Sequence, residues 1–142
     1  MKILLLNGPN LNMLGKREPE KYGNLTLESI ENSIIELGRK NNVEIECFQS
    51  NHEGEIIDKI QQTTCDGLII NAGGFTHTSV AIRDAISSVE IPTVEVHMTN
   101  IHAREEFRHT SLISGVSIGQ VVGLKEKSYE FALFGLIDYL NK

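Results

Sequence analysis

Several features that would assign this chain to a common functional class are scarce or missing. Its 142 residues contain no tryptophan and two cysteines, and 19 acidic side chains outnumber 13 basic ones, for a formal net charge of −6. This balance argues against a general binder of nucleic acid or acidic membranes, because phosphate groups are bound by basic surfaces. It leaves room for a small anionic substrate held by one or two arginines.

The cysteines and the apolar runs also exclude some classes. Cys47 and Cys65 are isolated, with no CxxC pair and no metal-ligand spacing, so we expect two structural thiols in a reducing, cytoplasmic compartment. No apolar run approaches the length of a membrane helix. The apolar start of the chain ends at Asn7, too early for a signal peptide, and is better interpreted as a strand.

Motifs for common cofactors are missing as well. The sequence has neither GxGxxG nor GxxxxGK[ST], and Pro9, in the loop after the first predicted strand, offers no amide proton to a phosphate. Flavin sites favour aromatic walls, which a chain without tryptophan supplies poorly. A Schiff base needs a desolvated lysine, whereas the lysines are expected in loops, at element ends or on helix faces: Lys2, Lys16, Lys21, Lys40, Lys59, Lys125, Lys127 and Lys142. We therefore expect no cofactor.

A metal site is a weaker alternative. His97 and His102 could be drawn as ligands together with Glu105 or Glu106, but their spacing matches no standard pattern. Glu95, two residues before His97, already offers that imidazole a hydrogen-bond partner. We predict no bound metal.

Hydrophobic patterning predicts a single α/β domain over residues 1–142. Strands are expected at 3–6, 43–48, 67–70, 91–97 and 116–122. Helices are expected after caps at Thr26 and at Thr78 or Ser79, after a capping box at Ser50–Glu53, after Asn100, and over 126–140. Strands alternating with helices predict a flavodoxin-like, doubly wound sheet of five parallel strands in a three-layer α/β/α sandwich, with strand 43–48 near an edge.

Polar residues follow three of these strands. Asn10 follows the first strand, Asn71 follows the third, and His97 ends the fourth. The carboxyl ends of parallel strands meet at one edge of the sheet, where such folds bind ligands. We therefore expect these side chains to converge on one crevice. The paired Gly73 and Gly74 would let backbone amides approach a ligand there.

The connection at 8–24 is unusually long and has no apolar periodicity, which indicates an active-site lid. It contains Arg17 and Tyr22. A tyrosine with its reference pKa of about 10 is a poor base, but an adjacent guanidinium would favour the phenolate once water is excluded. Together with Glu95 and His97 on one face of a strand, these groups suit proton transfer on a small oxyanion.

Six segments resemble type II 3-dehydroquinate dehydratase, in that family's order and over nearly the whole chain. They are Asn7-Gly-Pro-Asn-Leu-Asn, Leu14-Gly-Lys-Arg-Glu-Pro with Tyr22-Gly23, Asn71-Ala-Gly-Gly-Phe-Thr-His-Thr-Ser79, Arg83-Asp84-Ala85, Glu95-Val-His97 and Asn100-Ile-His-Ala-Arg-Glu-Glu-Phe-Arg108. The resemblance implies conversion of 3-dehydroquinate to 3-dehydroshikimate and water, by anti elimination through an enolate without metal or cofactor. The setting would be the shikimate pathway or quinate degradation, and the assembly a homododecamer of four trimers.

The resemblance also implies catalytic roles. Tyr22 matches the general base that takes the C2 proton, and Arg17 matches the cation that lowers its pKa. His97 matches the general acid that protonates the departing C1 hydroxyl, with Glu95 as its orienting partner. Asn10 matches the residue that holds a water against the enolate oxygen.

Substrate-binding roles follow in the same way. The match gives Asn71, Met98 and Thr99 to the carboxylate, and His77 and Arg108 to the ring hydroxyls. Asp84 matches a residue that the family contributes across a subunit boundary. At Thr99 we expected a serine; threonine keeps both the hydroxyl and the amide.

Structural interpretations stand beside these roles. His97 could be a satisfied core histidine, Tyr22 could pack the loop, and Arg17 could pair with a neighbouring glutamate. Asp84 could pair along its helix. The alternative function is a flavodoxin-like module that binds a small molecule or nucleotide without catalysis, which predicts no turnover and no need for Tyr22.

Overall fold

The computed structural model describes residues 1–16, 20 and 25–142. Its strands are β1 (Lys2–Asn7), β2 (Glu44–Gln49), β3 (Gly67–Asn71), β4 (Thr93–His97) and β5 (Gly119–Val122). They form one parallel sheet in the order β2-β1-β3-β4-β5. This is the predicted flavodoxin-like order, with β2 at an edge, and the prediction of a doubly wound α/β fold is confirmed.

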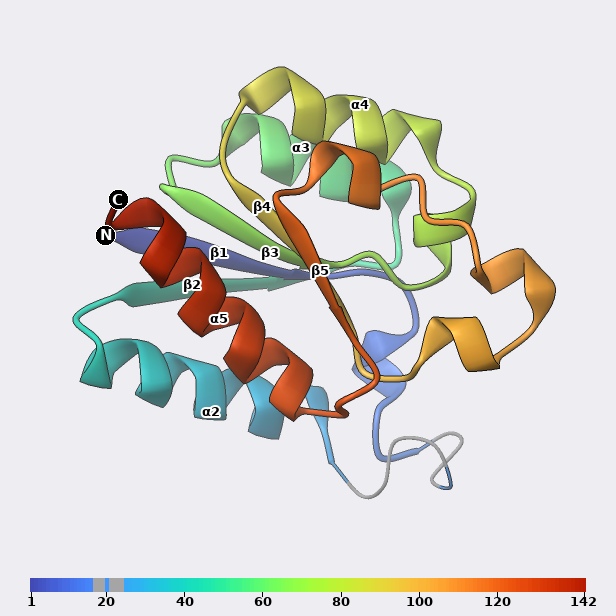
Figure 1. Ribbon diagram of the computed structural model, residues 1–142, viewed down its shortest axis with the longest axis horizontal. Coiled ribbons are helices and arrows are strands. Elements are labelled where there is room, and N and C mark those ends of the chain that lie inside the picture. The colour runs from blue at the N-terminus through green and yellow to red at the C-terminus, as the bar shows by residue number, and fades with distance from the viewer. Residues whose placement is uncertain (17–19, 21–24) are drawn as a thin grey trace.

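Among the described residues, helices cover both faces of the sheet (Figure 1). They are α2 (Leu27–Lys40) and α5 (Lys127–Leu140) on one face, and α3 (Glu53–Gln62) and α4 (Val80–Val89) on the other. Short 3-10 helices occupy the connections: η1 (Leu11–Met13), η2 (Gly73–His77), η3 (Ile101–Ala103), η4 (Glu106–Arg108) and η5 (Ser114–Val116). Within the described ranges, no helix is long and apolar enough to cross a membrane.

The central strands are buried on both faces, and their alternation divides the core. On β1, Ile3 and Leu5 pack toward α2 and α5, whereas Leu4 and Leu6 pack toward α3 and α4. All four side chains are 0% exposed. Apolar runs of this kind are expected for parallel strands covered by helices on both sides.

Three of the predicted helix caps are present. Thr26 forms a capping box with Ser29 at the start of α2, and Ser79 Oγ accepts from the Ile82 amide, at 2.9 Å, at the start of α4. Asn100 likewise caps η3 by accepting from the His102 amide. The short helix predicted after Asn100 is therefore replaced by the 3-10 helices η3 and η4.

The capping box predicted at Ser50–Glu53 is wrong. Helix α3 begins at Glu53 with His52 at the cap position, and no side chain caps it. Ser50 still belongs to the sheet end, because its amide donates to the Asn7 carbonyl at 3.1 Å. Its hydroxyl instead accepts from the His52 amide at 2.9 Å and donates to Glu55 Oε1 at 2.5 Å.

The predicted start of the fifth strand is also wrong. Residues 116–118 were expected in the strand, but Val116 ends η5, whose turn is closed by local bonds between the Val116 amide and the Ile113 carbonyl. Ser117 Oγ strengthens this turn by donating to the same Ile113 carbonyl at 2.9 Å. Pairing with the sheet starts where the Ile118 amide reaches the Thr93 carbonyl at 2.7 Å.

Candidate active site

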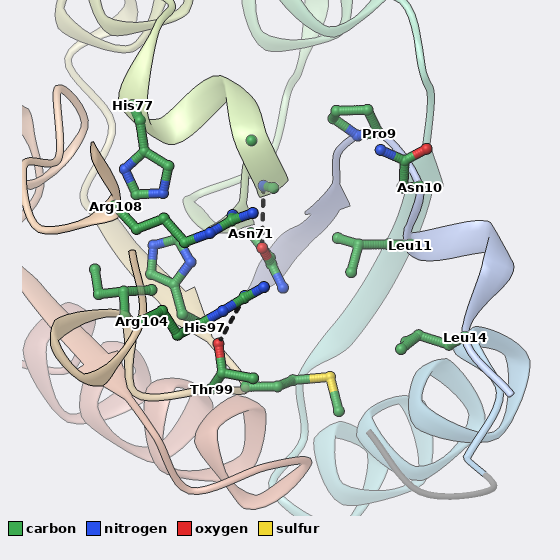
Figure 2. Close-up of a pocket in the computed structure, with 14 residues that line it drawn as sticks. Pro9, Asn10, Leu11, Leu14, Asn71, His77, His97, Thr99, Arg104 and Arg108 are labelled. Atoms are coloured by element: carbon green, nitrogen blue, oxygen red, sulfur yellow. Dashed lines mark hydrogen bonds between the residues drawn. The ribbon is translucent and has the colours of Figure 1, made fainter. Parts of the chain in front are cut away.

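A pocket of about 150 Å³ opens at the carboxyl ends of β1, β3 and β4 (Figure 2). The predicted site residues that line it are Asn10, Asn71, His77, His97, Met98, Thr99 and Arg108. They come from the loop after β1, from the end of β3 and the connection after it, and from the end of β4 and the segment after it. The structure thus brings together side chains from three connections beside the β1–β3 switch point, where doubly wound sheets bind ligands.

His97 and Glu95 form a buried hydrogen-bonded pair at the end of β4. Strand alternation places both side chains on one face, and His97 Nε2 lies 2.5 Å from Glu95 Oε2. Glu95 is 0% exposed and His97 is 6% exposed. Because an ionised carboxylate only accepts, Nε2 carries a proton, and Nδ1 is the ring nitrogen left for a ligand.

Glu95 remains an anion despite its burial. Burial raises the pKa of this carboxyl, but the hydrogen bond and charge of His97, with further bonds from Gln120 and Ser111, bring the pKa below its ordinary value. Ser111 Oγ lies 2.9 Å from each carboxylate oxygen. The same Oγ accepts from the Ile113 amide at 3.1 Å, so the serine is itself held in place.

His77 lies beside His97, with ring centroids 6.3 Å apart and ring planes 20° apart. Its Nδ1 donates to the Thr110 carbonyl at 2.8 Å. Burial lowers the pKa of His77, helped by the positive charges of His97 and Arg108 and opposed by the Thr110 bond. A neutral ring with its proton on Nδ1 leaves Nε2 as an acceptor, which suits a ligand hydroxyl.

Asn71 presents an amide whose orientation is fixed. The Gly73 amide donates to Asn71 Oδ1 at 3.1 Å, and Asn71 Nδ2 donates to the Tyr129 hydroxyl at 2.9 Å. The second hydrogen on Nδ2 is therefore a donor for the pocket. An anion is the natural partner for such a donor.

The loop after β1 is held over the pocket by the end of β2. Asn10 has φ 71°, in the left-handed region that asparagine tolerates, and its amide donates to Asn51 Oδ1 at 3.0 Å. Gln49 Nε2 donates to the Gly8 carbonyl at 3.1 Å. Leu11 of the same loop lines the pocket with Asn10.

Two arginines bring positive charge to the pocket. Arg108 was predicted, but Arg104 was not, and both line the pocket (Figure 2). Arg104 donates to Thr99 Oγ1 at 3.3 Å, while Arg108 Nε donates to Glu105 Oε2 at 2.9 Å. Thr99 thus keeps its hydroxyl at the pocket in place of the expected serine.

Of the predicted site residues that the structure describes, Glu95 and Asp84 do not line this pocket. Glu95 reaches it through His97, and Asp84 is exposed on α4. Arg17 and Tyr22 lie outside the described residues. Glu20, which is described, borders a neighbouring groove together with Met98, Thr99 and Arg104, all three of which also line the pocket.

The groups at the pocket are imidazoles, amides and guanidiniums. In the part of the chain that the structure describes, no three histidine, cysteine, aspartate or glutamate side chains are grouped as metal ligands. The arrangement can bind an anion, accept from a hydroxyl and transfer a proton from an imidazole.

Sequence reasoning missed three residues around this site. Arg104 had a signal, since it lies four residues before Arg108 in the same connection. Ser111 had none, because a serine in a loop is usually a turn residue. Tyr129 fits the apolar stripe of α5, a pattern typical of core packing, and only its hydrogen bond with Asn71 in the folded structure gives it a polar role as well.

Comparisons with known proteins agree with this geometry. The family described as dehydroquinase class II matches residues 1–137. The chain is similar to the 3-dehydroquinate dehydratase of Histophilus somni strain 2336, with 57% identity covering 99% of this chain and 95% of that protein. For the 3-dehydroquinate dehydratase of Haemophilus influenzae the identity is 54%, covering 99% and 96%.

A solved structure shows the same likeness. The type II dehydroquinase from Butyrivibrio crossotus superposes with a TM-score of 0.93 at 52% identity, covering 100% of this chain and 98% of that one. A 3-dehydroquinate dehydratase-like protein from Bifidobacterium longum is more distant, with a TM-score of 0.74 and 25% identity. The family match and the full-length relatives together show that this chain belongs to the class II dehydroquinase family.

Proposed function

We propose that this class II dehydroquinase removes water from 3-dehydroquinate to give 3-dehydroshikimate, in the shikimate pathway or in quinate degradation. The observation that carries the proposal is the buried Glu95–His97 pair at a pocket lined by anion-binding groups. The proposal is also supported by full-length relatives that are named 3-dehydroquinate dehydratase. A binding module without catalysis would have no use for a buried carboxylate that orients an imidazole.

The substrate carboxylate would bind where donors converge. Asn71 Nδ2 offers one hydrogen, and the Thr99 hydroxyl and the Met98 and Thr99 backbone amides would supply further donors from residues that line the same pocket. The carbonyls of His97 and Met98 accept from the amides of Gly123 and Lys125 at 3.1 and 2.9 Å, which fixes this segment against the connection between β5 and α5. His77 and Arg108 are then available to the ring hydroxyls.

Elimination would proceed through an enolate. Tyr22, as a phenolate favoured by Arg17, takes the C2 proton, and Asn10 holds a water against the developing enolate oxygen. His97 then gives the proton on Nδ1 to the C1 hydroxyl, which leaves as water while the C1–C2 double bond forms. The charges and protons balance without a cofactor or metal, and Glu95 stabilises the imidazolium before the transfer.

The loop at 8–24 would act as a lid. Its described part already lines the pocket through Asn10, Leu11 and Leu14, and Glu20 borders Thr99 and Arg104. Closure would exclude water, which strengthens the attraction between Arg17 and a phenolate.

The cellular setting and assembly complete the proposal. Cys47 and Cys65 are free, and burial together with Glu31 raises the pKa of Cys47 to about 12. Unpaired, unreactive thiols suit a reducing cytoplasm. The protein is proposed to be a homododecamer of four trimers, in which Asp84 reaches the pocket of a neighbouring subunit.

An assay with purified protein, 3-dehydroquinate and a chelator tests this function, followed by the ultraviolet absorbance of the conjugated product. We expect turnover by the wild type and a loss of at least about 10²-fold for Tyr22→Phe and for His97→Ala, because each removes a proton-transfer group. Tyr139→Phe, which alters an exposed tyrosine of α5, is the control and should keep full activity.

Wild-type protein without turnover would favour the binding module instead. Full activity of Tyr22→Phe would overturn the role of that residue as the base, and full activity of His97→Ala would do the same for the acid.

A further inference from the structure

We propose that Tyr129 is a positioning residue that sets the Asn71 amide to donate toward the substrate carboxylate, with Asn7 as the acceptor that orients the tyrosine. The proposal rests on the carboxylate-binding role proposed above for Asn71. It assigns a function to two buried polar side chains that the elimination mechanism does not use.

The three side chains come from separate elements and meet inside the core. Asn7 and Asn71 are register partners on the adjacent strands β1 and β3, and Tyr129 approaches from α5. Asn7 and Tyr129 are 0% exposed and Asn71 is 4% exposed. The Tyr129 hydroxyl lies 2.6 Å from Asn7 Oδ1 and 2.9 Å from Asn71 Nδ2.

The direction of these hydrogen bonds follows from one backbone amide. The Gly73 amide can only donate, so Asn71 must turn Oδ1 toward it and Nδ2 toward Tyr129. The tyrosine oxygen then accepts from Asn71, and its single proton goes to Asn7 Oδ1. The Gly73 amide, Asn71 Nδ2 and the Tyr129 hydroxyl each face an acceptor, whereas Asn7 Nδ2 has no hydrogen-bond partner among the described residues.

The path matters because a carboxylate discriminates between the two ends of an amide. With Nδ2 held toward Tyr129, the second hydrogen on that nitrogen is available to an anion in the pocket. Without the tyrosine oxygen, Nδ2 loses the partner that holds its plane, and the amide is free to rotate away or to turn Oδ1 toward the anion. Binding would weaken equally in the ground state and the transition state, since the carboxylate takes no part in bond breaking.

The experiment compares Tyr129→Phe with Tyr139→Phe in steady-state kinetics with 3-dehydroquinate. Tyr129→Phe keeps the buried ring and removes only the hydroxyl, whereas Tyr139→Phe makes the same change on an exposed side chain of the same helix. We expect the KM to rise roughly fivefold for Tyr129→Phe with kcat nearly unchanged, as loss of uniform binding predicts. Tyr139→Phe should leave both constants at the wild-type values.

Double variants test whether Tyr129 acts through Asn71. Asn71→Ala should raise the KM by itself, and adding Tyr129→Phe to it should raise the KM no further, because the orienting oxygen then has nothing to orient. Asn7→Ala is the second variant. It removes the acceptor of the Tyr129 hydroxyl proton, which can then turn toward Asn71 and disturb the bond from Asn71 Nδ2. It should raise the KM in the same direction and should likewise have no effect in the Asn71→Ala background.

The outcomes separate the two proposals. An unchanged KM for Asn71→Ala would overturn the carboxylate-binding role of Asn71 and this proposal with it. A raised KM for Asn71→Ala, with a wild-type KM for both Tyr129→Phe and Asn7→Ala, would overturn only the positioning role. Tyr129→Phe could also lower kcat both in the wild type and in the Asn71→Ala background. That result would show a general structural effect and would overturn the positioning role.

Discussion

Ser111 and Glu95 show at the residue scale how a buried charge is kept ionised. Burial favours the neutral carboxylic acid, and hydrogen bonds from His97, Gln120 and Ser111 reverse that preference. The lowered pKa means that the ionised form stabilises the folded protein above the ordinary pKa of a glutamate. This stabilisation is lost as the pH falls through the folded-state pKa.

Ser111→Ala should move the acid side of the pH–activity profile to higher pH. The change removes a bond that favours the carboxylate, so the pKa of Glu95 rises, and His97 loses its anionic partner at a less acidic pH. We expect a loss of roughly three- to tenfold in kcat at neutral pH. The measurement is kcat against pH, with Ser117→Ala, a loop serine bonded to the Ile113 carbonyl, as the control. An acid limb that stays in place would contradict this role.

At the scale of secondary-structure elements, the backbone of the β3–α4 connection helps to shape the site. Gly73 has φ 58°, and a Cβ there would lie 3.0 Å from the Pro9 carbonyl oxygen. Its amide is also the donor that orients Asn71. Gly74, the other half of the pair, has open space around the position of a Cβ. The sequence pattern does not distinguish the two glycines, whereas in the structure only Gly73 has a backbone conformation and surroundings that disfavour a Cβ.

Gly73→Ala should therefore destabilise the protein by about 1–2 kcal/mol, the cost of a left-handed conformation for a residue with a Cβ. It should also raise the KM, because Asn71 moves with the backbone. Gly74→Ala is the matched control and should change the free energy of unfolding by less than about 1 kcal/mol. Urea unfolding of both variants measures the difference, and equal losses of stability would argue against this account.

The same scale shows where sequence patterns fail. Strand and helix existence follows from periodicity, and all five predicted strands are present. The boundaries failed at two serines: the Ser50 backbone amide donates to the Asn7 carbonyl at the sheet end, and Ser117 Oγ donates to the Ile113 carbonyl in the 3-10 turn before β5. Hydrophobic periodicity carries no information about either hydrogen bond.

At the scale of the whole molecule, Asp84 raises the question of assembly. It is exposed on α4 and does not line the pocket of its own subunit. A role for it in catalysis therefore requires a neighbouring subunit that brings this helix face to a second pocket, as the proposed trimers would.

Light scattering should give a mass twelve times that of one chain, in agreement with a dodecamer. Asp84→Asn should raise the KM, whereas Asp138→Asn should not, because Asp138 is an exposed carboxylate of α5 that pairs with Lys142. A monomeric wild type, or an Asp84→Asn variant with wild-type kinetics, would contradict a site shared between subunits.

The sequence by itself determined the fold class, the family and the residue types at the strand ends, because buried parallel strands need continuous apolar runs and the family's motifs are contiguous. Only the tertiary structure decided how those residues face one another: which histidine nitrogen bears the proton, that Ser111 holds Glu95, and that Tyr129 meets Asn71 and Asn7. Asn7 and Tyr129 are 122 positions apart. Hydrogen-bond direction depends on three-dimensional neighbours, and no local pattern in the chain encodes it.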